Sequence, residues 1–283
     1  MNSKPPRVRD AVILMAGMGS RLRANGHDIP KPLFPFLGRP LAVYTLEILG
    51  RAGVTNIYAV TGFEHEIITS ELAGLAPKGV KLQFIHNPEF RKQNGISVLC
   101  AAGVVPSPFL LSMSDHLFED AVVELMAEQP EPDVLSVAID RKIESIFDLP
   151  DAMKIMTEED RVVEIGKELS VFDAIDTGLF LCSSKFFDYL TRAKQNEDCS
   201  LADGVRLAAS EGKATVVDIE EAWWQDVDTR EMLREAERRM RESSSRSVAA
   251  KTSERQQGQG EAAHADREPE MQNPLRQARN GQQ

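Results

Sequence analysis

The residues nearest the N-terminus that could do chemistry form a glycine-rich loop. The apolar run Ala11–Met15 leads into this loop, and Lys31-Pro32-Leu33 follows ten residues after its arginine. Glycines after a buried strand let backbone N–H groups turn toward an anion, and Arg21 and Lys31 add positive charge. The pattern predicts a polyphosphate site whose contacts come from Lys31 and the loop residues Ala16, Gly17, Met18, Gly19, Ser20 and Arg21.

Two better-known phosphate loops fit this segment poorly. A Walker A loop needs a lysine after its second glycine, and none follows Gly19. A dinucleotide-binding loop needs a third small residue where Leu22 stands, and an acidic residue after the second strand, which ends in Val60-Thr61-Gly62. The Walker A loop and the dinucleotide-binding loop therefore remain minor alternatives. A third alternative, without any function, is an ordinary turn between a strand and a helix.

Two acidic positions could hold the cation that accompanies a polyphosphate. Mg²⁺ takes oxygen ligands and is usually held by one or two carboxylates plus the phosphates themselves. Asp115 follows the apolar run Phe109–Met113, and the end of a central strand is where open α/β sheets place ligands. Asp226 is the second candidate, while Asp228 could instead cap the helix expected from Thr229. His116 could orient Asp115, touch a substrate phosphate, or be a hydrogen-bonded structural residue.

Short apolar runs that alternate with amphipathic stretches position these residues in a layered α/β fold. The expected strands are Ala11–Met15, Asn56–Thr61, Val80–His86, Phe109–Met113, Val134–Ile139, Met153–Met156, Val162–Ile165, Thr177–Cys182 and Ala214–Ile219. The expected helices are Pro40–Arg51, Phe63–Leu75, Gly95–Val104, Lys185–Lys194, Leu201–Ser210 and Thr229–Arg241. One α/β domain over residues 1–242 accounts for this order, and the polar composition of 243–283 predicts a disordered tail.

Composition excludes several classes of protein. The 283 residues carry 33 Lys+Arg and 44 Asp+Glu, a formal net charge of −11, which disfavours a general nucleic-acid binder. Three widely spaced cysteines rule out a disulfide scaffold and fit a reducing compartment. No apolar run reaches the roughly 20 residues of a membrane span, and the N-terminus lacks a secretory signal. We therefore expect a cytoplasmic protein with no membrane span.

The glycine-rich loop resembles that of a known family. A-x-G-x-G-[ST]-R followed by K-P-L is similar to the signature of nucleotidyltransferases that activate sugar phosphates and related alcohol phosphates. The resemblance implies a three-layer α/β/α fold with a mixed, mainly parallel central sheet, of the nucleotide-diphospho-sugar transferase type. Asp226 matches the late metal aspartate of that family's W-x-D motif. The D-V-D-T sequence and the segment Asn87–Ser97 resemble the inositol-1-phosphate cytidylyltransferase branch.

The same resemblance implies roles for further residues. Arg21 and Lys31 become the catalytic cations, and Asn94, Gly95 and Ser97 read the nucleobase, although helix capping explains that segment equally simply. Lys167 meets the phosphate of the second substrate, with Asp176 and Thr177 at the pocket wall. Lys167 could instead be a solvated lysine in a loop, and Thr177 an ordinary strand residue.

The combined expectation is a Mg²⁺-dependent cytidylyltransferase that joins CTP to a small phosphorylated alcohol, most simply inositol 1-phosphate, with release of pyrophosphate. The alternatives are a phosphocholine or aminoethylphosphonate cytidylyltransferase, a sugar-1-phosphate nucleotidyltransferase, a non-catalytic nucleotide-binding regulator, and an interaction protein acting through its tail. Any lipid step that uses the product would belong to a separate membrane enzyme. The sequence leaves open whether the protein forms a homo-oligomer.

Overall fold

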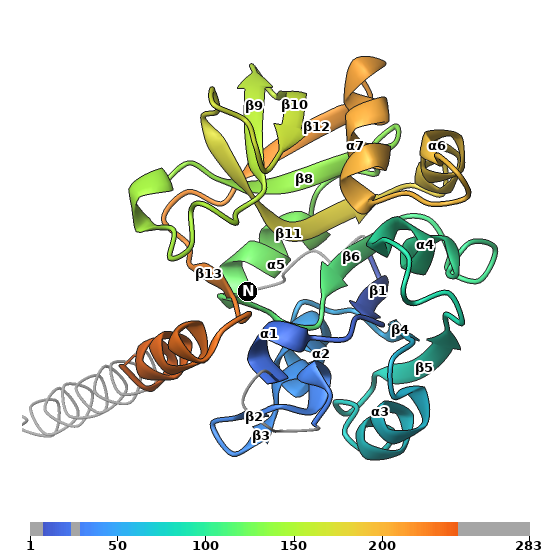
Figure 1. Ribbon diagram of the computed structural model, residues 1–283, viewed down its shortest axis with the longest axis vertical. Coiled ribbons are helices and arrows are strands. Elements are labelled where there is room, and N and C mark those ends of the chain that lie inside the picture. Colours follow the sequence, from blue (N-terminus) through green and yellow to red (C-terminus); the bar gives the residue numbers. More distant parts are fainter. Residues whose placement is uncertain (1–7, 24–28, 243–283) are drawn as a thin grey trace, which may run out of the picture. The chain divides into compact units, whose positions relative to one another are not determined.

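A nine-stranded sheet forms the centre of the structure, a computed structural model that describes residues 8–23 and 29–242. The strand order is β5-β4-β1-β6-β11-β8-β12-β10-β9 (Figure 1). The pairs β5–β4, β4–β1, β1–β6 and β8–β12 are parallel and the other pairs antiparallel, so only β11 and β10 run against the remaining strands. The mixed, mainly parallel sheet is confirmed. The predicted tail, 243–283, lies outside the described residues, so the predicted domain boundary at residue 242 stays a prediction.

The elements follow one another in an alternating order. The strands of the main sheet are β1 (Asp10–Met15), β4 (Asn56–Thr61), β5 (Lys81–His86), β6 (Phe109–Met113), β8 (Leu135–Asp140), β9 (Lys154–Glu158), β10 (Arg161–Gly166), β11 (Ala174–Cys182) and β12 (Ala214–Asp218). The labelled α-helices are α1 (Ser20–Arg23), α2 (Leu41–Arg51), α3 (His65–Leu72), α4 (Asn94–Leu99), α5 (Asp120–Ala127), α6 (Phe186–Ala193) and α7 (Leu201–Ser210), with short 3-10 turns at Lys31–Leu33 and Ile143–Ser145. A further helix, expected over Thr229–Arg241, is present from residue 230 to the last described residue, 242. Two small ribbons pair β2 (Pro35–Phe36) with β3 (Arg39–Pro40) and β7 (His116–Phe118) with β13 (Trp224–Asp226).

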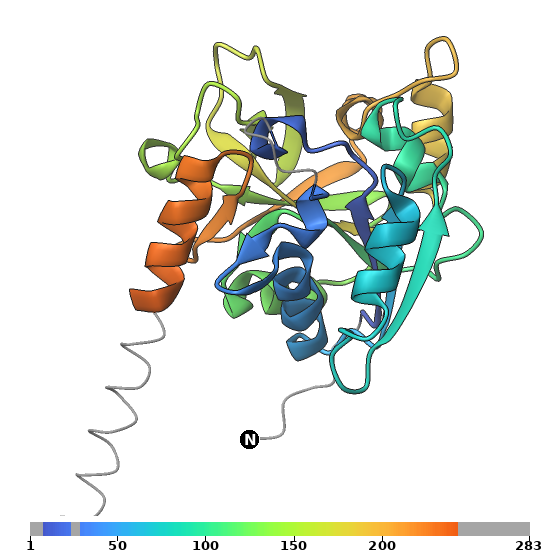
Figure 2. The same cartoon turned by 60° about the horizontal axis from the view of Figure 1, so that its bottom comes forward.

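Helices cover both faces of the sheet because its central strands are apolar on both sides. In β1, Val12 and Leu14 pack in one core with side chains of α4, α6 and α7. Ala11, Ile13 and Met15 point to the other face and pack with α2, α3 and α5. Figure 2 shows α2 and α3 together on this second face. The predicted three-layer architecture is confirmed.

Two pairings bring the chemistry-bearing residues together. Strands β1 and β6 are parallel neighbours, so the glycine-rich loop after Met15 and Asp115 after Met113 leave the same edge of the sheet. The ribbon β7–β13 then aligns Asp226 with His116, and the backbone N–H of Val227 donates to the carbonyl of Asp115 at 2.9 Å. This ribbon places the early and the late aspartate beside each other across 111 positions of sequence.

Several boundaries differ from those expected. The expected helix Gly95–Val104 is only α4, Asn94–Leu99, because the chain turns through residues 100–104. The expected helix Phe63–Leu75 shortens to α3, since Glu64 adopts a left-handed conformation with φ of 51°. Helix α5 and the strands β7 and β13 were not predicted. Across the described residues, no helix combines the length and apolar character needed to cross a membrane.

Candidate active site

The glycine-rich loop lines a cavity of about 340 Å³ at the carboxyl end of β1. Gly19 has φ of 58°, and a Cβ there would lie 2.6 Å from Cβ of Lys31, so only glycine lets the loop pass this closely. Most of the predicted nucleotide-binding residues line this cavity, namely Ala16, Gly17, Gly19, Ser20, Arg21, Lys31, Asn94, Ser97 and Asp115. Met18 and Gly95 are not among its lining residues.

Lys31 is a buried cation between two carboxylates. Only 7% of the residue is exposed, and its Nζ forms ion pairs with Asp115 and Asp228. Burial opposes the charged ammonium, but the two carboxylates raise the pKa of Lys31 above its ordinary value. Burial likewise opposes ionised Asp115, yet Lys31 and the hydrogen bond from His116 hold the pKa of that carboxyl well below its usual range. The pair is therefore charged at neutral pH.

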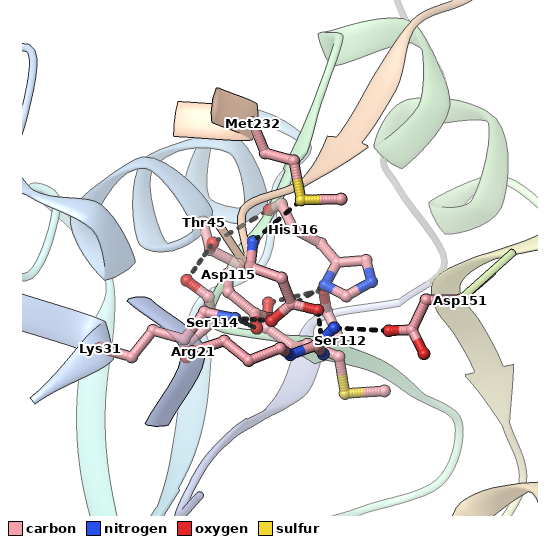
Figure 3. Close-up of polar contacts among 11 residues, drawn as sticks. Arg21, Lys31, Thr45, Ser112, Ser114, Asp115, His116, Asp151 and Met232 are labelled. Carbon is pink, nitrogen blue, oxygen red and sulfur yellow. Dashed lines mark hydrogen bonds and ion pairs between the residues drawn. The ribbon is translucent and has the colours of Figure 1, made fainter. Parts of the chain in front are cut away.

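Arg21 extends the ion network to a second element. Its Nη1 lies 2.6 Å from Oδ2 of Asp151 (Figure 3). Its Nη2 lies 2.6 Å from Oδ2 of Asp228. Asp228 therefore bridges Arg21 and Lys31. The capping alternative for Asp228 is wrong, because the hydroxyl of Thr229 accepts the backbone N–H of Met232 at 3.2 Å and caps the helix that begins at 230.

A second cavity of about 580 Å³ adjoins the first. Both are lined by Arg21, Asn94, Met113, Asp115, His116 and Asp228, so they share a wall. The second cavity adds Lys167, Asp176 and Asp226 from the predicted site. Nζ of Lys167 lies 2.6 Å from Oδ1 of Asp151. Two anionic ligands, one in each cavity, could therefore meet beside Arg21 and Asp115.

Asp176 and His116 form the inner wall of the second cavity. Burial raises the pKa of Asp176 to about 6, although the backbone N–H of Gly178 donates to this carboxyl at 2.8 Å. His116 Nδ1 is hydrogen-bonded to Oδ1 of Asp115 at 2.9 Å, and its ring lies parallel to that of Trp224, 6.0 Å between centroids. The geometry fits the role of orienting Asp115, one of the three roles considered for His116.

Asp226 has the surroundings expected of a cation ligand. Burial raises its pKa, and the negative charges of Asp228 and Asp115 add to this increase, while His116 opposes it. No ion pair to Asp226 exists among the described residues. These residues contain no group of three or more His, Cys, Asp or Glu side chains arranged to hold a metal. A carboxylate pair, Asp115 and Asp226, nevertheless fits Mg²⁺, whose remaining ligands usually come from phosphates and water.

The predicted base-reading residues have structural partners of their own. Asn94 Oδ1 accepts the backbone N–H of Leu201 at 2.8 Å, which leaves its amide N–H₂ for another acceptor. Ser97 accepts a hydrogen bond of 2.9 Å from the amide of Asn87. A Cβ on Gly95 would lie 2.6 Å from the carbonyl oxygen of Cys199, so the small size of Gly95 serves the packing of α4 against the start of α7.

Thr177 lies outside the lining of both cavities. It is fully buried, and its hydroxyl donates to the carbonyl of Ala138 at 2.9 Å, which joins β11 to β8. Sequence reasoning missed Asp151 and Arg206, which line the second cavity. Asp151 stands in a loop without a motif, and Arg206 lies on a helix whose pattern indicates only amphipathicity. Nothing in the local sequence distinguishes either residue.

Comparison with known proteins gives a consistent picture. The family model described as nucleotidyl transferase matches residues 10–243. A bifunctional IPC transferase and DIPP synthase of Rubrobacter xylanophilus is 35% identical over 230 residues, 80% of this chain and 51% of that protein. A protein of the same name from Archaeoglobus fulgidus is 31% identical over 82% of this chain and 44% of its own length. The chain thus spans about half the length of these relatives.

Solved structures show the same fold. The inositol-1-phosphate CTP transferase from T. maritima superposes with a TM-score of 0.70 and 26% sequence identity. The match covers 81% of this chain and 93% of that one. The three-layer nucleotide-diphospho-sugar transferase-like fold expected from the sequence is confirmed.

Proposed function

The chain belongs to the nucleotidyl transferase family, and on that premise we propose that it is a Mg²⁺-dependent cytidylyltransferase that converts CTP and inositol 1-phosphate to CDP-inositol and pyrophosphate. The observation that carries the proposal is the shared wall of the two cavities, where Arg21 and Asp115 face both. The names of the similar proteins, which include an inositol-1-phosphate CTP transferase, support this choice of substrates. A cytoplasmic location belongs to the proposal, in keeping with three free cysteines.

The first cavity takes CTP. Backbone N–H groups from Gly17 to Ser20 and the side chains of Arg21 and Lys31 bind the triphosphate. The Asn94 amide, whose oxygen is already bonded to α7, donates to the cytosine, and Ser97 lies beside it. Gly95 acts indirectly in this proposal, because it seats α4 on Cys199 and so fixes the position of Asn94.

The second cavity takes inositol 1-phosphate. Lys167 binds its phosphate, and Asp176 accepts hydrogen bonds from ring hydroxyls. Thr177 supports this wall from behind by its hydrogen bond to β8. Arg206, on α7, adds a second positive charge to the same cavity.

Catalysis in this arrangement consists of positioning and charge neutralisation. A phosphate oxygen of inositol 1-phosphate attacks the α-phosphorus of CTP, the bond from that phosphorus to the bridging α–β oxygen breaks, and pyrophosphate leaves with the electron pair. The attacking phosphate is already an anion, so no strong base is required. Arg21 and Lys31 stabilise the negative charge on the leaving pyrophosphate. Asp115 and Asp226 would hold Mg²⁺, which supplies positive charge to the phosphate oxygens when bound.

Pyrophosphate release from CTP in the presence of Mg²⁺ tests the proposal. A panel of inositol 1-phosphate, phosphocholine, aminoethylphosphonate and a hexose 1-phosphate, each with CTP and UTP, separates the alternatives. Turnover should be fastest with CTP and inositol 1-phosphate. Asp115→Asn and Asp226→Asn should each abolish turnover while the circular dichroism spectrum stays native. No turnover with any pair, or turnover by either variant equal to that of the wild type, contradicts the proposal.

A further inference from the structure

Asp151 holds a cation from each of the two cavities. Its Oδ2 lies 2.6 Å from Nη1 of Arg21, and its Oδ1 lies 2.6 Å from Nζ of Lys167. Hydrogen bonds from Lys167 and Arg21 hold the pKa of Asp151 below its ordinary value, although burial opposes them, so the carboxylate is charged at neutral pH. One carboxylate therefore occupies donor atoms that a phosphate in either cavity would need.

The segment that carries Asp151 is anchored at its two ends: Arg141 forms ion pairs with Asp173 and Asp218, and the carbonyl of Met153 accepts the backbone N–H of Asp176 at 2.9 Å. Residues 141–154 include no buried residue, in contrast to the buried Asp140 and Ile155 at its two ends. A local turn shapes the tip, where the backbone N–H groups of Asp151 and Ala152 both donate to the carbonyl of Asp148 at 3.1 Å. Phe147 in the same segment is 53% exposed. Movement of the Asp151 side chain alone would therefore break exposed ion pairs and leave Met153, which packs against the core, in place.

We propose that Asp151 is a specificity-determining residue, an internal counter-anion whose carboxylate competes with substrate phosphates for Arg21 and Lys167, so that the site favours the two substrates together over either one alone. The inference rests on the proposed function for the identity of those substrates. This role of Asp151 differs from that of Asp228, which pairs with the buried Lys31 and with the other terminal nitrogen of Arg21.

The coupling follows from the two oxygens of one carboxylate. A phosphate that binds Lys167 displaces the carboxylate of Asp151, and because both carboxylate oxygens move with one side chain, the ion pair with Arg21 is lost as well. The second phosphate then meets a cation that has already been released, so it has no ion pair of Asp151 left to break. Each substrate thereby favours the binding of the other. A small anion such as free phosphate gains less, because it replaces only one of the two pairs.

Asp151→Asn tests this inference, since it keeps the shape of the side chain and removes its charge. The probes are inositol 1-phosphate and pyrophosphate, which do not react with each other and can be titrated by calorimetry singly and together. Exposed ion pairs are weak, so the variant should bind each probe alone about threefold to tenfold more tightly than the wild type. The factor by which one bound probe increases the affinity for the other should be larger in the wild type than in the variant.

The matched control is Glu144→Gln. Glu144 lies in the same segment, is exposed, and makes no ion pair within the described part of the chain. This control makes the same change in net charge and should bind both probes as the wild type does. An equal increase in probe affinity for E144Q and D151N would overturn the inference, because a general effect of net charge would explain both.

Kinetics gives an independent readout. D151N should lower KM for each substrate measured at low concentration of the other. Unchanged or weaker binding by D151N, or a raised KM for inositol 1-phosphate, would overturn the inference, since Asp151 would then be inert or a direct substrate ligand. Absence of turnover by the wild-type chain would contradict the proposed function instead, and the binding titrations would still decide the competition by Asp151.

Discussion

Trp224 donates its indole N–H to the buried carboxylate of Asp140 across 2.9 Å. This bond ties β13 to the end of β8, while the same indole ring lies at 12° to the ring of His116. His116 in turn is hydrogen-bonded to Asp115. Trp224 therefore links the ribbon that carries Asp226 both to the main sheet and to the histidine that contacts Asp115.

Replacement of Trp224 by phenylalanine should separate the hydrogen bond from the stacking. The variant keeps a ring over His116 but leaves the Oδ2 atom of buried Asp140 without its indole donor, so the free energy of unfolding should fall by about 1–2 kcal/mol. We expect kcat to fall severalfold and KM for CTP to change little, because the loop proposed to bind the triphosphate is untouched. Urea denaturation and initial rates measure the two effects.

Trp224→Ala is the comparison for this variant. It removes the stacking as well, so both losses should exceed those of Trp224→Phe. Equal kcat for the wild type and both variants would show that the ribbon holds its position without the tryptophan.

Removal of the buried cation at position 31 should be strongly destabilising. Lys31→Met leaves Asp115 and Asp228 close together with no ammonium between them, and breaking a buried ion pair of this kind costs about 3–5 kcal/mol. Lys78→Met is a suitable control, since Lys78 is exposed, and should change stability by less than about 0.5 kcal/mol. Denaturant titration compares the two.

A second substitution tests the cause of that loss. Asp228→Asn in the Lys31→Met background removes one of the two carboxylates that have lost the ammonium, although Asp228 also loses its ion pair with Arg21, and should restore part of the lost stability. A double mutant less stable than Lys31→Met would contradict this electrostatic account.

The loop, the strand-end aspartate and the buried strands were predictable because each is a local pattern. Gly17, Gly19 and Arg21 are close in sequence, and apolar runs of β-branched residues indicate buried strands wherever they occur. The parallel pairing of β1 and β6 then follows from general rules for α/β folds, and it places Asp115 beside the loop.

The ribbon β7–β13 and the position of Asp151 were not predictable in this way. Each ribbon strand has three residues, and its partner lies about a hundred positions away, so neither periodicity nor turn signals reveal the pairing. Asp151 reaches Arg21 across 130 positions from a loop without a motif. Helix α4 ends early because tertiary packing, rather than helix propensity, decides its length.

The ionisation of Asp176 predicts a pH dependence of stability. Burial raises its pKa from 3.8 to about 6, so the folded protein binds more protons than the unfolded chain between these values. Stability contributed by the protonated form is therefore lost as pH rises from about 4 to 6, by at most about 3 kcal/mol. Asp176→Asn lacks this loss and should be more stable than the wild type at pH 7.5, but not at pH 4.

Urea denaturation of both proteins between pH 4 and 8 measures the difference. The gap between the two stability curves should open through pH 4–6 and stay constant above that range. Parallel curves would mean that Asp176 titrates with an ordinary pKa. Because the Asn variant also changes the proposed wall of the second cavity, its KM for inositol 1-phosphate should rise.

Gly178 lies directly against the ring of His116. Its φ is 76°, and a Cβ there would stand 2.5 Å from Cδ2 of the imidazole, so Gly178→Ala combines backbone strain with a collision that displaces the ring. Since His116 orients Asp115, we expect a loss of stability of about 2 kcal/mol or more, together with a fall in kcat of at least about tenfold.

Gly103→Ala separates the two contributions. Gly103 has a similar φ of 73°, but nothing lies within 4 Å of the Cβ that alanine would add, so this control carries the strain without the collision. It should cost about 1 kcal/mol and leave kcat unchanged, because the turn that contains it lies after α4 and lines neither cavity. Equal effects of the two alanines on kcat would mean that the ring of His116 can move without disturbing Asp115. A fall in kcat confined to Gly178→Ala would instead tie the position of that ring to the chemistry of the site.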